Sequence, residues 1–491
     1  MTAAELGAGT ASQAMYQDFR DSVRSGRYEN DVAQRHRSGS RLAESPAIDR
    51  DQVDIVTTAL TLPPTMPLSP DRSVPLSTDR SVPLSPDRSL PAGAQPLPGG
   101  LDAWLTTVTP DLIAIRHHLH AHPELSGQEF ETAAMVAREL AIAGLTPRLL
   151  PKGNGVLCDI PGASGGPVVA LRADLDALPL PDVKNVPYRS KVPGACHACG
   201  HDVHTTILLG VGFALARLAE RGLLPGPVRL IFQPSEEAFP SGAPEVIAAG
   251  GLTDVSAIFA LHCAPQLPVG QIGVRSGPFT ASSDVVDVTL RGPGGHTARP
   301  HLTADLLHAL GRVIVDVPAL LDRRVDARTG VSMVWAAVRA GEAANTIPSV
   351  AQVRGTVRTL SKELRGELPE LVSRLVHEVV AGTGAQAEVN YCLGVPPVVN
   401  DRVATAVVES AAAAALGTGQ VVEAEISMGG EDFAYYLEEV PGAMLRLGVG
   451  VPDATTRLDI HQSTFDIDDR AIGHGVRAMV HTALTALRTC F

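Results

Sequence analysis

Two cysteines, three histidines and an aspartate lie within nine consecutive residues, in segment 196–204 with the sequence CHACGHDVH. Thiolates and imidazoles are the side chains that borderline and transition metals prefer as ligands. Packing alone explains this density poorly, because a buried histidine or aspartate needs a hydrogen-bonding partner. An apolar stretch that reads as a helix follows at residues 205–218. The segment therefore predicts a loop-to-helix corner that carries metal ligands; a buried structural corner with inert cysteines is the alternative.

Acidic residues and a further histidine follow three apolar strands. From about residue 101, short runs rich in β-branched residues alternate with helical patterns, which is typical of an α/β fold with a mostly parallel, buried sheet. The runs at 168–172, 228–232 and 257–261 lead into Asp174 and Asp176, into Glu236 and Glu237, and into His262. Because ligands of such sheets bind beyond the carboxyl ends of the strands, we expect these side chains to meet the corner at one sheet edge.

These donors fit a hydrolase that binds two divalent metal ions. The candidate ligands come from the corner, from strand ends and from a loop near the C-terminus: Cys199, His201, Glu237, His262 and His461. Two metal ions about 3.5–4 Å apart need a bridging anionic ligand. A thiolate can bridge, since binding to a metal deprotonates it.

The remaining carboxylates suit supporting roles. Of the two adjacent acids, Glu237 can bind a metal while Glu236 takes a proton from a water molecule. Asp176, after the neighbouring strand, could orient a metal-binding histidine. Structural interpretations remain open: the two glutamates could be a solvated pair, and His262 a hydrogen-bonded core histidine.

A different pattern occupies residues 283–393. Its predicted elements run strand, helix, strand, strand, helix, strand, which is the order of the ferredoxin-like split β-α-β fold. A helix–strand pattern resumes afterwards. We therefore predict a catalytic domain formed by residues 101–282 and 394–491, with this unit inserted as a lid over the sheet edge.

The first hundred residues differ from the rest. An octapeptide recurs in tandem from Ser69, and its frequent proline and serine favour extended chain, so we interpret residues 1–100 as a disordered tail. The formal net charge of −13 argues against nucleic-acid binding. Six cysteines in 491 residues form no disulfide framework, and we find neither a secretory signal nor a run of about 18 apolar residues. We expect a cytoplasmic protein that binds no membrane.

Short motifs in a consistent order connect the candidate residues. They are RADLDALP at 172–179, HACGHD at 197–202, QPSEE at 233–237, ALH at 260–262, GGHTARPH at 294–301, NTIP at 345–348, GTVR at 355–358, MGGEDF at 428–433 and HQSTFD at 461–466. With these motifs the chain resembles the metal-dependent aminoacylase/carboxypeptidase amidohydrolases, in the branch of hippurate hydrolases and auxin-conjugate hydrolases. The resemblance covers about Ile113 to Arg477, nearly everything outside the tail.

The resemblance implies a role for each site residue. It implies Glu236 as the general base and Asp176 as the supporting carboxylate, with two divalent ions of zinc, manganese, cobalt or nickel as cofactors. It also implies that Cys199 bridges these ions and that the metal ligands are the five residues Cys199, His201, Glu237, His262 and His461.

The resemblance assigns further residues to the inserted unit. It implies a homodimer that forms through this unit's sheet edge and helix. His296 and Asn345 would then face the scissile carbonyl, across the dimer, and Arg358 would bind the free carboxylate of the substrate. From the residues alone, His296 could simply follow a turn, Asn345 could cap one, and Arg358 could pair with a surface acid.

Three features depart from the pattern or stand outside it. Cys196 occupies a position where the family usually has methionine, and it forms a CxxC pair with Cys199. A redox dithiol is the minor alternative interpretation of this pair. Residues 238–242 replace a glycine-rich run, which alters the expected substrate pocket. His118 and His122 have the i,i+4 spacing of metal ligands, but without acidic or cysteine neighbours we interpret them as structural.

The sequence therefore predicts a metal-dependent amidohydrolase that cleaves the amide bond of N-acyl amino acids and related acyl- or aryl-amides with a free carboxylate. The competing hypothesis is a non-catalytic binding or regulatory protein with the same fold. The complete set of ligands together with Glu236 favours the enzyme.

Overall fold

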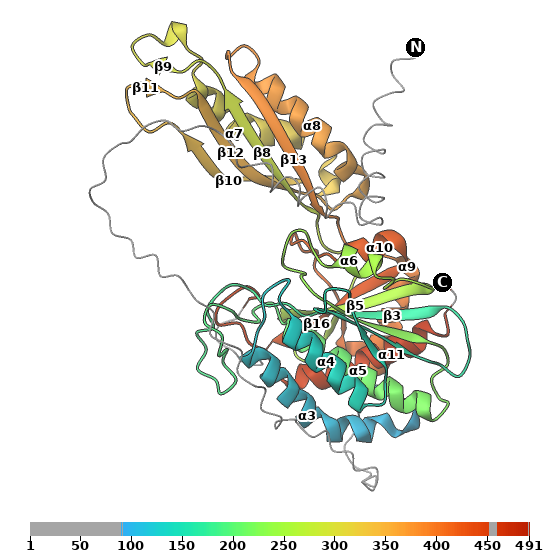
Figure 1. Cartoon of the computed structure of the whole chain (residues 1–491). Coiled ribbons are helices and arrows are strands. Elements are labelled where there is room, and N and C mark those ends of the chain that lie inside the picture. Colours follow the sequence, from blue (N-terminus) through green and yellow to red (C-terminus); the bar gives the residue numbers. More distant parts are fainter. Residues whose placement is uncertain (1–89, 91, 451–458, 490) are drawn as a thin grey trace, which may run out of the picture. The chain divides into compact units, whose positions relative to one another are not determined.

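The computed structural model describes residues 90, 92–450, 459–489 and 491 (Figure 1). The octapeptide repeats and most of the predicted tail lie outside the described residues. Residues shortly before the first long helix pack on the rest of the chain: Leu97 is buried, and the Gln95 amide donates to the Ala414 carbonyl over 2.7 Å.

A large eight-stranded sheet forms the centre of the fold (Figure 1). Its strand order is β1-β2-β4-β3-β5-β16-β6-β15, and β4, β3, β5 and β16 run parallel to one another. The bounds of its strands are β1 (Pro147–Leu149), β2 (Val156–Ile160), β3 (Val168–Asp174), β4 (Val228–Gln233), β5 (Val255–Pro268), β6 (Ile272–Val274), β15 (Val421–Glu423) and β16 (Gly442–Gly450). The expected mixed α/β fold with a mostly parallel sheet is thus confirmed.

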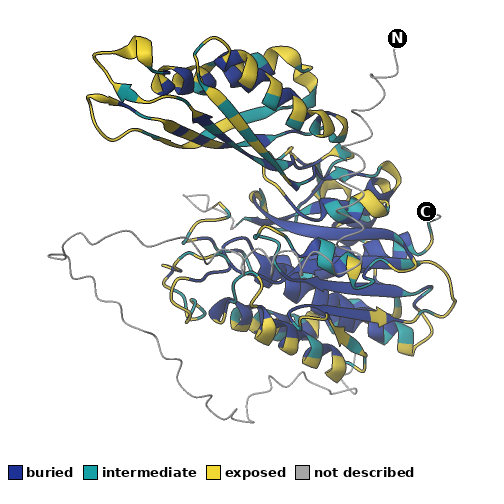
Figure 2. Ribbon diagram, turned by 45° about the horizontal axis from the view of Figure 1, so that its top comes forward, coloured by how far each residue is buried: buried dark blue, intermediate teal, exposed yellow. Residues whose placement is uncertain are grey.

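Both faces of this sheet are buried, which explains its nearly continuous apolar sequences. In β5, Phe259 and Leu261 join one hydrophobic cluster, whereas Ile258 and Ala260 join another on the opposite face. Figure 2 shows these strands almost entirely in the colour of buried residues. The helices of this unit are α3 (Leu101–Ala121), α4 (Phe130–Ile142), α5 (His201–Glu220), α6 (Ala243–Ala248), α9 (Arg402–Leu416), α10 (Ala434–Glu439) and α11 (Arg470–Ala486).

Helix α5 is the central helix of the larger hydrophobic cluster and contacts both α3 and α11. By length and composition it is the one helix, among those described, that could cross a membrane. However, 89% of the relevant stretch is buried inside the structure, as in the core helix of a globular fold.

Helix α3 is longer than the helix that the sequence predicts at about residues 111–121. It begins at Leu101 and includes Pro110. Its buried face continues through this point with Leu105, Val108 and Leu112. Burial of that face therefore outweighs the lost backbone hydrogen bond.

A second sheet belongs to residues 283–395, which we call the small unit (Figure 1). Its antiparallel strand order is β10-β12-β8-β13. Every second residue of β8 is buried, and these residues form a separate core with the two helices of the unit. In chain order the main elements are β8 (Ser283–Arg291), α7 (Leu306–Arg324), β10 (Ser332–Ala340), β12 (Val350–Arg358), α8 (Lys362–Val380) and β13 (Gln386–Val395).

Candidate metal centre and active site

The corner that carries Cys199 and His201 is shaped by Gly200, the residue that precedes α5. Gly200 has φ +92°, a left-handed conformation that strongly favours glycine. A Cβ atom at this position would also lie 2.8 Å from the Sγ atom of Cys263. The glycine thus allows the sharp turn that places the thiol of Cys199 and the ring of His201 at the start of the helix.

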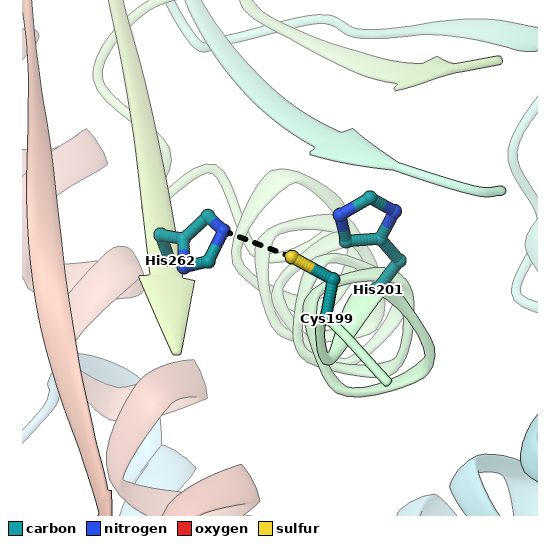
Figure 3. A group of neighbouring side chains, drawn as sticks. All are labelled: Cys199, His201 and His262. Atoms are coloured by element: carbon teal, nitrogen blue, oxygen red, sulfur yellow. Dashed lines mark hydrogen bonds between the residues drawn. The ribbon is translucent and has the colours of Figure 1, made fainter. Parts of the chain in front are cut away.

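The first group of candidate ligands comprises Cys199, His201 and His262, all buried (Figure 3). The Cys199 Sγ atom lies 3.5 Å from Nε2 of His262, which projects from β5. The other ring nitrogen of His262 lies 2.8 Å from the Cys263 carbonyl, to which it donates. This contact leaves the Nε2 lone pair directed at the thiol. Burial and the charge of Arg446 both lower the pKa of His262 well below its usual value, which favours the neutral ring that binds metals.

A second group contains Cys199, Glu237 and His461. Nε2 of His461 lies 3.1 Å from Oε1 of Glu237. The backbone amide of His461 donates to the Ala198 carbonyl over 2.7 Å, which ties the C-terminal loop to the corner. His461 has φ +61°, a conformation that is uncommon for residues other than glycine and is often found at functional sites. Cys199 is the residue that belongs to both groups.

Asp176 contacts one candidate ligand from each group. Its Oδ1 atom lies 3.2 Å from Nδ1 of His201, and its backbone oxygen lies 2.9 Å from the same nitrogen. Its Oδ2 atom accepts hydrogen bonds from the Glu237 amide, over 2.9 Å, and from the Ser126 hydroxyl, over 2.7 Å. Burial would raise the pKa of Asp176, but these hydrogen bonds and the charge of His201 hold it below its usual value. The carboxylate can therefore orient both His201 and Glu237.

One buried nitrogen at this site, Nε2 of His201, forms no hydrogen bond with any described residue, although carboxylate oxygens of Asp174 and Glu237 lie 3.8 and 3.9 Å away. Burial favours the neutral ring of His201, but Asp174, Asp176 and Glu237 raise its pKa to about 10. Such a concentration of carboxylates around an unpartnered ring nitrogen is the environment that a divalent cation stabilises. The residues present therefore fit a metal site.

Glu236 lies beside these groups and is surrounded by other acids. One of its oxygens accepts a hydrogen bond from the Asp432 amide over 3.4 Å. Burial and the neighbouring Glu431, Glu237 and Asp432 raise the pKa of Glu236 well above its usual value. The preceding residue, Ser235, has φ +57°, so this strand end also departs from extended geometry.

A buried arginine, which the sequence reasoning missed, connects the ends of β3 and β4 to the loop before α10. Arg172 contacts Asp174 over 2.7 Å and Asp432 over 2.6 Å, and it donates to the Gln233 side chain over 2.9 Å. Asp174 in turn lies 2.6 Å from the ring of His204. Each of these residues lies in or beside a motif quoted above. The motifs therefore marked these residues but did not indicate which of them form pairs.

A second buried arginine joins the corner to the C-terminal segment. Arg116 contacts Asp202 and Asp466, each over 2.9 Å. Oδ2 of Asp202 also lies 2.7 Å from the ring of His120. These contacts hold residues next to His201 and shortly after His461 in fixed positions, and they give the ring of His120 a partner.

Cys196 lies apart from the two ligand groups. Its Sγ atom is 4.0 Å from the Lys184 ammonium, which also contacts the ring of His120 over 2.9 Å. Cys196 and Cys199 are both buried free thiols, so the CxxC pair forms no disulfide in this structure.

The three candidate residues of the small unit are not part of either ligand group. His296 and Asn345 lie next to each other, because β9 (Gly295–His296) pairs with β11 (Thr346–Ile347) and the Thr297 amide donates to the Asn345 carbonyl over 3.1 Å. Both side chains are exposed. Arg358, at the end of β12, donates to the backbone oxygen of Met428 over 2.8 Å.

Comparisons with known proteins agree with this architecture. The chain is 40% identical over 379 residues to the N-acetylcysteine deacetylase of Bacillus subtilis, covering 77% of this chain and 97% of that protein. It is 48% identical over 377 residues, or 77% of its own length, to a Rhodococcus jostii protein named putative glutamate–cysteine ligase 2-3, but spans only 46% of that relative. A Bacillus subtilis crystal structure described as a dinuclear metal binding peptidase from the M20 family matches with a TM-score of 0.69 and 38% identity. That match covers 78% of this chain and 99% of the other.

A model of Peptidase family M20/M25/M40 matches residues 170–485. The match starts in β3 and ends in α11, so it includes all five candidate ligands and the small unit. The chain therefore belongs to Peptidase family M20/M25/M40.

Proposed function

We propose that this chain is a metal-dependent amidohydrolase that cleaves N-acyl amino acids into a carboxylic acid and an amino acid. The observation that carries the proposal is the pair of ligand groups that share Cys199, with Glu236 beside them. Relatives named N-acetylcysteine deacetylase, N-acyl-L-amino acid amidohydrolase and IAA-amino acid hydrolase support this substrate class.

The proposed cofactors are two divalent metal ions, with zinc, manganese, cobalt and nickel as the candidates. Cys199, His201 and His262 would hold one ion, and Cys199, Glu237 and His461 the other. When bound, the ions would polarise the amide carbonyl and acidify a water molecule. Burial and Glu237 raise the pKa of the Cys199 thiol, so this thiol is protonated without a metal. It would lose its proton on binding an ion, because a metal-bound cysteine is a thiolate.

Glu236 is the proposed general base and acid. It would take the proton of the attacking water and later transfer it to the nitrogen of the leaving amine. Asp176 would hold His201 and Glu237 in place through the contacts described above. The small unit would act as a lid of ferredoxin-like topology. From it, His296 and Asn345 would polarise the scissile carbonyl, and Arg358 would bind the free carboxylate of the substrate.

We propose a homodimer that forms through β10 and α7 of the small unit. Exposed valines and a leucine gather there, at Val334 and Val338 on β10 and at Leu307 and Val315 on α7. A hollow of about 720 Å³ lies between these two elements. Apolar surface of this kind commonly marks a protein–protein contact. We also propose a cytoplasmic location, which the free buried thiols support.

Hydrolysis of a panel of N-acetyl- and N-benzoyl-amino acids would test the function, using the full chain supplied with Mn²⁺, Zn²⁺ or Co²⁺. We expect amino-acid release that a chelator abolishes and that returns when metal is added back. Glu236→Gln should keep its bound metal but lose turnover by about 100-fold or more. Metal-loaded protein without turnover on any of these amides would favour the non-catalytic hypothesis.

A further inference from the structure

We propose that Arg446 binds a carboxylate of the substrate in addition to the one assigned to Arg358, so that the preferred substrates carry two carboxylates. The inference rests on the proposed function and names its substrate class more closely. It concerns a residue of the large sheet.

Arg446 is the direct neighbour of a candidate metal ligand. It lies on β16 in register with His262 on the parallel strand β5. Neighbouring strands are about 4.8 Å apart, and residues in register project from the same face of a sheet. The guanidinium is therefore on the side from which His262 reaches Cys199, and its charge is one cause of the lowered pKa of His262.

The surroundings of Arg446 hold the side chain without neutralising it. Its guanidinium carbon lies 4.8 Å from the ring centre of Phe279, which is fully buried. On its other side Arg446 pairs with Gly273 of β6, where a Cβ atom would come within 3.2 Å of the Arg446 Cβ. An aromatic ring on which it stacks and a neighbour without a side chain give the guanidinium both support and space.

Arg446 forms no ion pair with any residue that the structure describes, although it is largely buried. Other arginines with buried guanidinium groups each contact a carboxylate: Arg116 with Asp202, Arg172 with Asp174, Arg229 with Asp159, Arg365 with Asp284 and Arg477 with Asp102. The carboxylate of Glu431 is near, but it pairs with Arg172 over 3.3 Å.

A buried charge without a partner is costly unless it serves a ligand. The planar guanidinium presents two parallel N–H groups that match a carboxylate. A single carboxylate would satisfy either Arg358 or Arg446, so two arginines on different units point to two carboxylates. The second could belong to an acidic amino acid or to a dicarboxylic acyl group; both have the same chemistry at this site.

The test compares three substrates with the metal-loaded full chain: N-acetylalanine with one carboxylate, N-acetylglutamate with a second on the amino acid, and N-succinylalanine with a second on the acyl group. We expect kcat/KM for one of the latter two to exceed that for N-acetylalanine by about 10-fold or more. The better substrate identifies the side of the amide that faces Arg446.

Arg446→Met should bring this ratio close to one, and Arg446→Lys, which keeps the charge but not the planar fork, should retain part of it. Arg328→Met is the matched control, because Arg328 is exposed and pairs only with Asp326 among the described residues. The melting temperature of Arg446→Met should equal or exceed that of the wild type, since methionine can cover Phe279 without burying a charge. A structural role would instead lower the melting temperature.

An unchanged ratio in Arg446→Met, or a wild type without preference, would overturn the inference. Failure of the proposed function is distinguishable, because calorimetric binding of glutamate and succinate, compared with alanine and acetate, needs no turnover. If no substrate is cleaved, weaker dicarboxylate binding by Arg446→Met would still support the inference, and equal binding would overturn it.

Discussion

At the scale of single residues, Cys199 differs from the other candidate ligands because it belongs to both groups. Cys199→Ala should therefore lower the occupancy of both proposed metal positions, whereas His461→Ala should lower only one. We expect about one ion per chain in His461→Ala and fewer in Cys199→Ala, measured by elemental analysis after gel filtration. Equal metal content in the two variants would contradict a bridging role for the thiolate.

Asp176 acts on the site through its neighbours. Asp176→Asn replaces one accepting oxygen with an N–H donor, which must then face His201, Ser126 or the Glu237 amide. We expect metal affinity, measured by competition with a chelator, to fall about 10- to 100-fold. Ser126→Ala removes one of these hydrogen bonds and is the milder control. Affinities that are equal in Asp176→Asn and wild type would show that the carboxylate does not position the ligands.

The sequence predicted that several candidate ligands lie close together, and local order was sufficient for three of them. Cys199, His201 and His262 follow from a corner and a strand end, and the structure places them in one group. The pairing of Arg172 with Asp432 was missed, because these residues are far apart in the chain and only folding brings their side chains within 2.6 Å. Such pairs depend on strand order in the sheet, which residue type and spacing do not specify.

At the scale of elements, the turn before α5 depends on one glycine. Gly200→Ala should lower the free energy of unfolding by about 1–3 kcal/mol, because φ is +92° and the new methyl group would meet Cys263. Gly366→Ala is a matched control within α8, where a Cβ atom meets nothing within 4 Å. That control should raise stability by about 0.4–1 kcal/mol. Equal changes of stability in chemical denaturation would argue that the corner can relax.

Element types were easier to predict than their limits. The apolar runs at 168–172 and 257–261 lie within β3 and β5, although β5 continues to Pro268. The predicted helix began about ten residues too late, because α3 continues through Pro110 and its buried face extends on both sides of this residue. Burial in the folded protein determines where α3 begins, and the local sequence alone does not indicate this position.

At the scale of the whole molecule, the proposed dimer depends on the exposed edge of the small unit. Val338→Asp places a charge on β10 at a side chain that is 57% exposed, so the fold should tolerate it while self-association weakens. Val403→Asp makes the same change on α9, where valine is 47% exposed, and should leave association unchanged. Sedimentation analysis of both variants is the measurement. A wild type that sediments as a monomer would refute the dimer.

The position of β16 has a consequence for how the protein is made. This strand lies between β5 and β6 in the sheet, yet the small unit separates it from them in the chain. During vectorial synthesis the ribosome must therefore translate the small unit, which takes roughly 6 to 23 seconds, before the strand that joins β5 to β6 emerges. Until then the nascent chain presents two unpaired strand edges, and neither His461 nor Arg446 is available to complete the site.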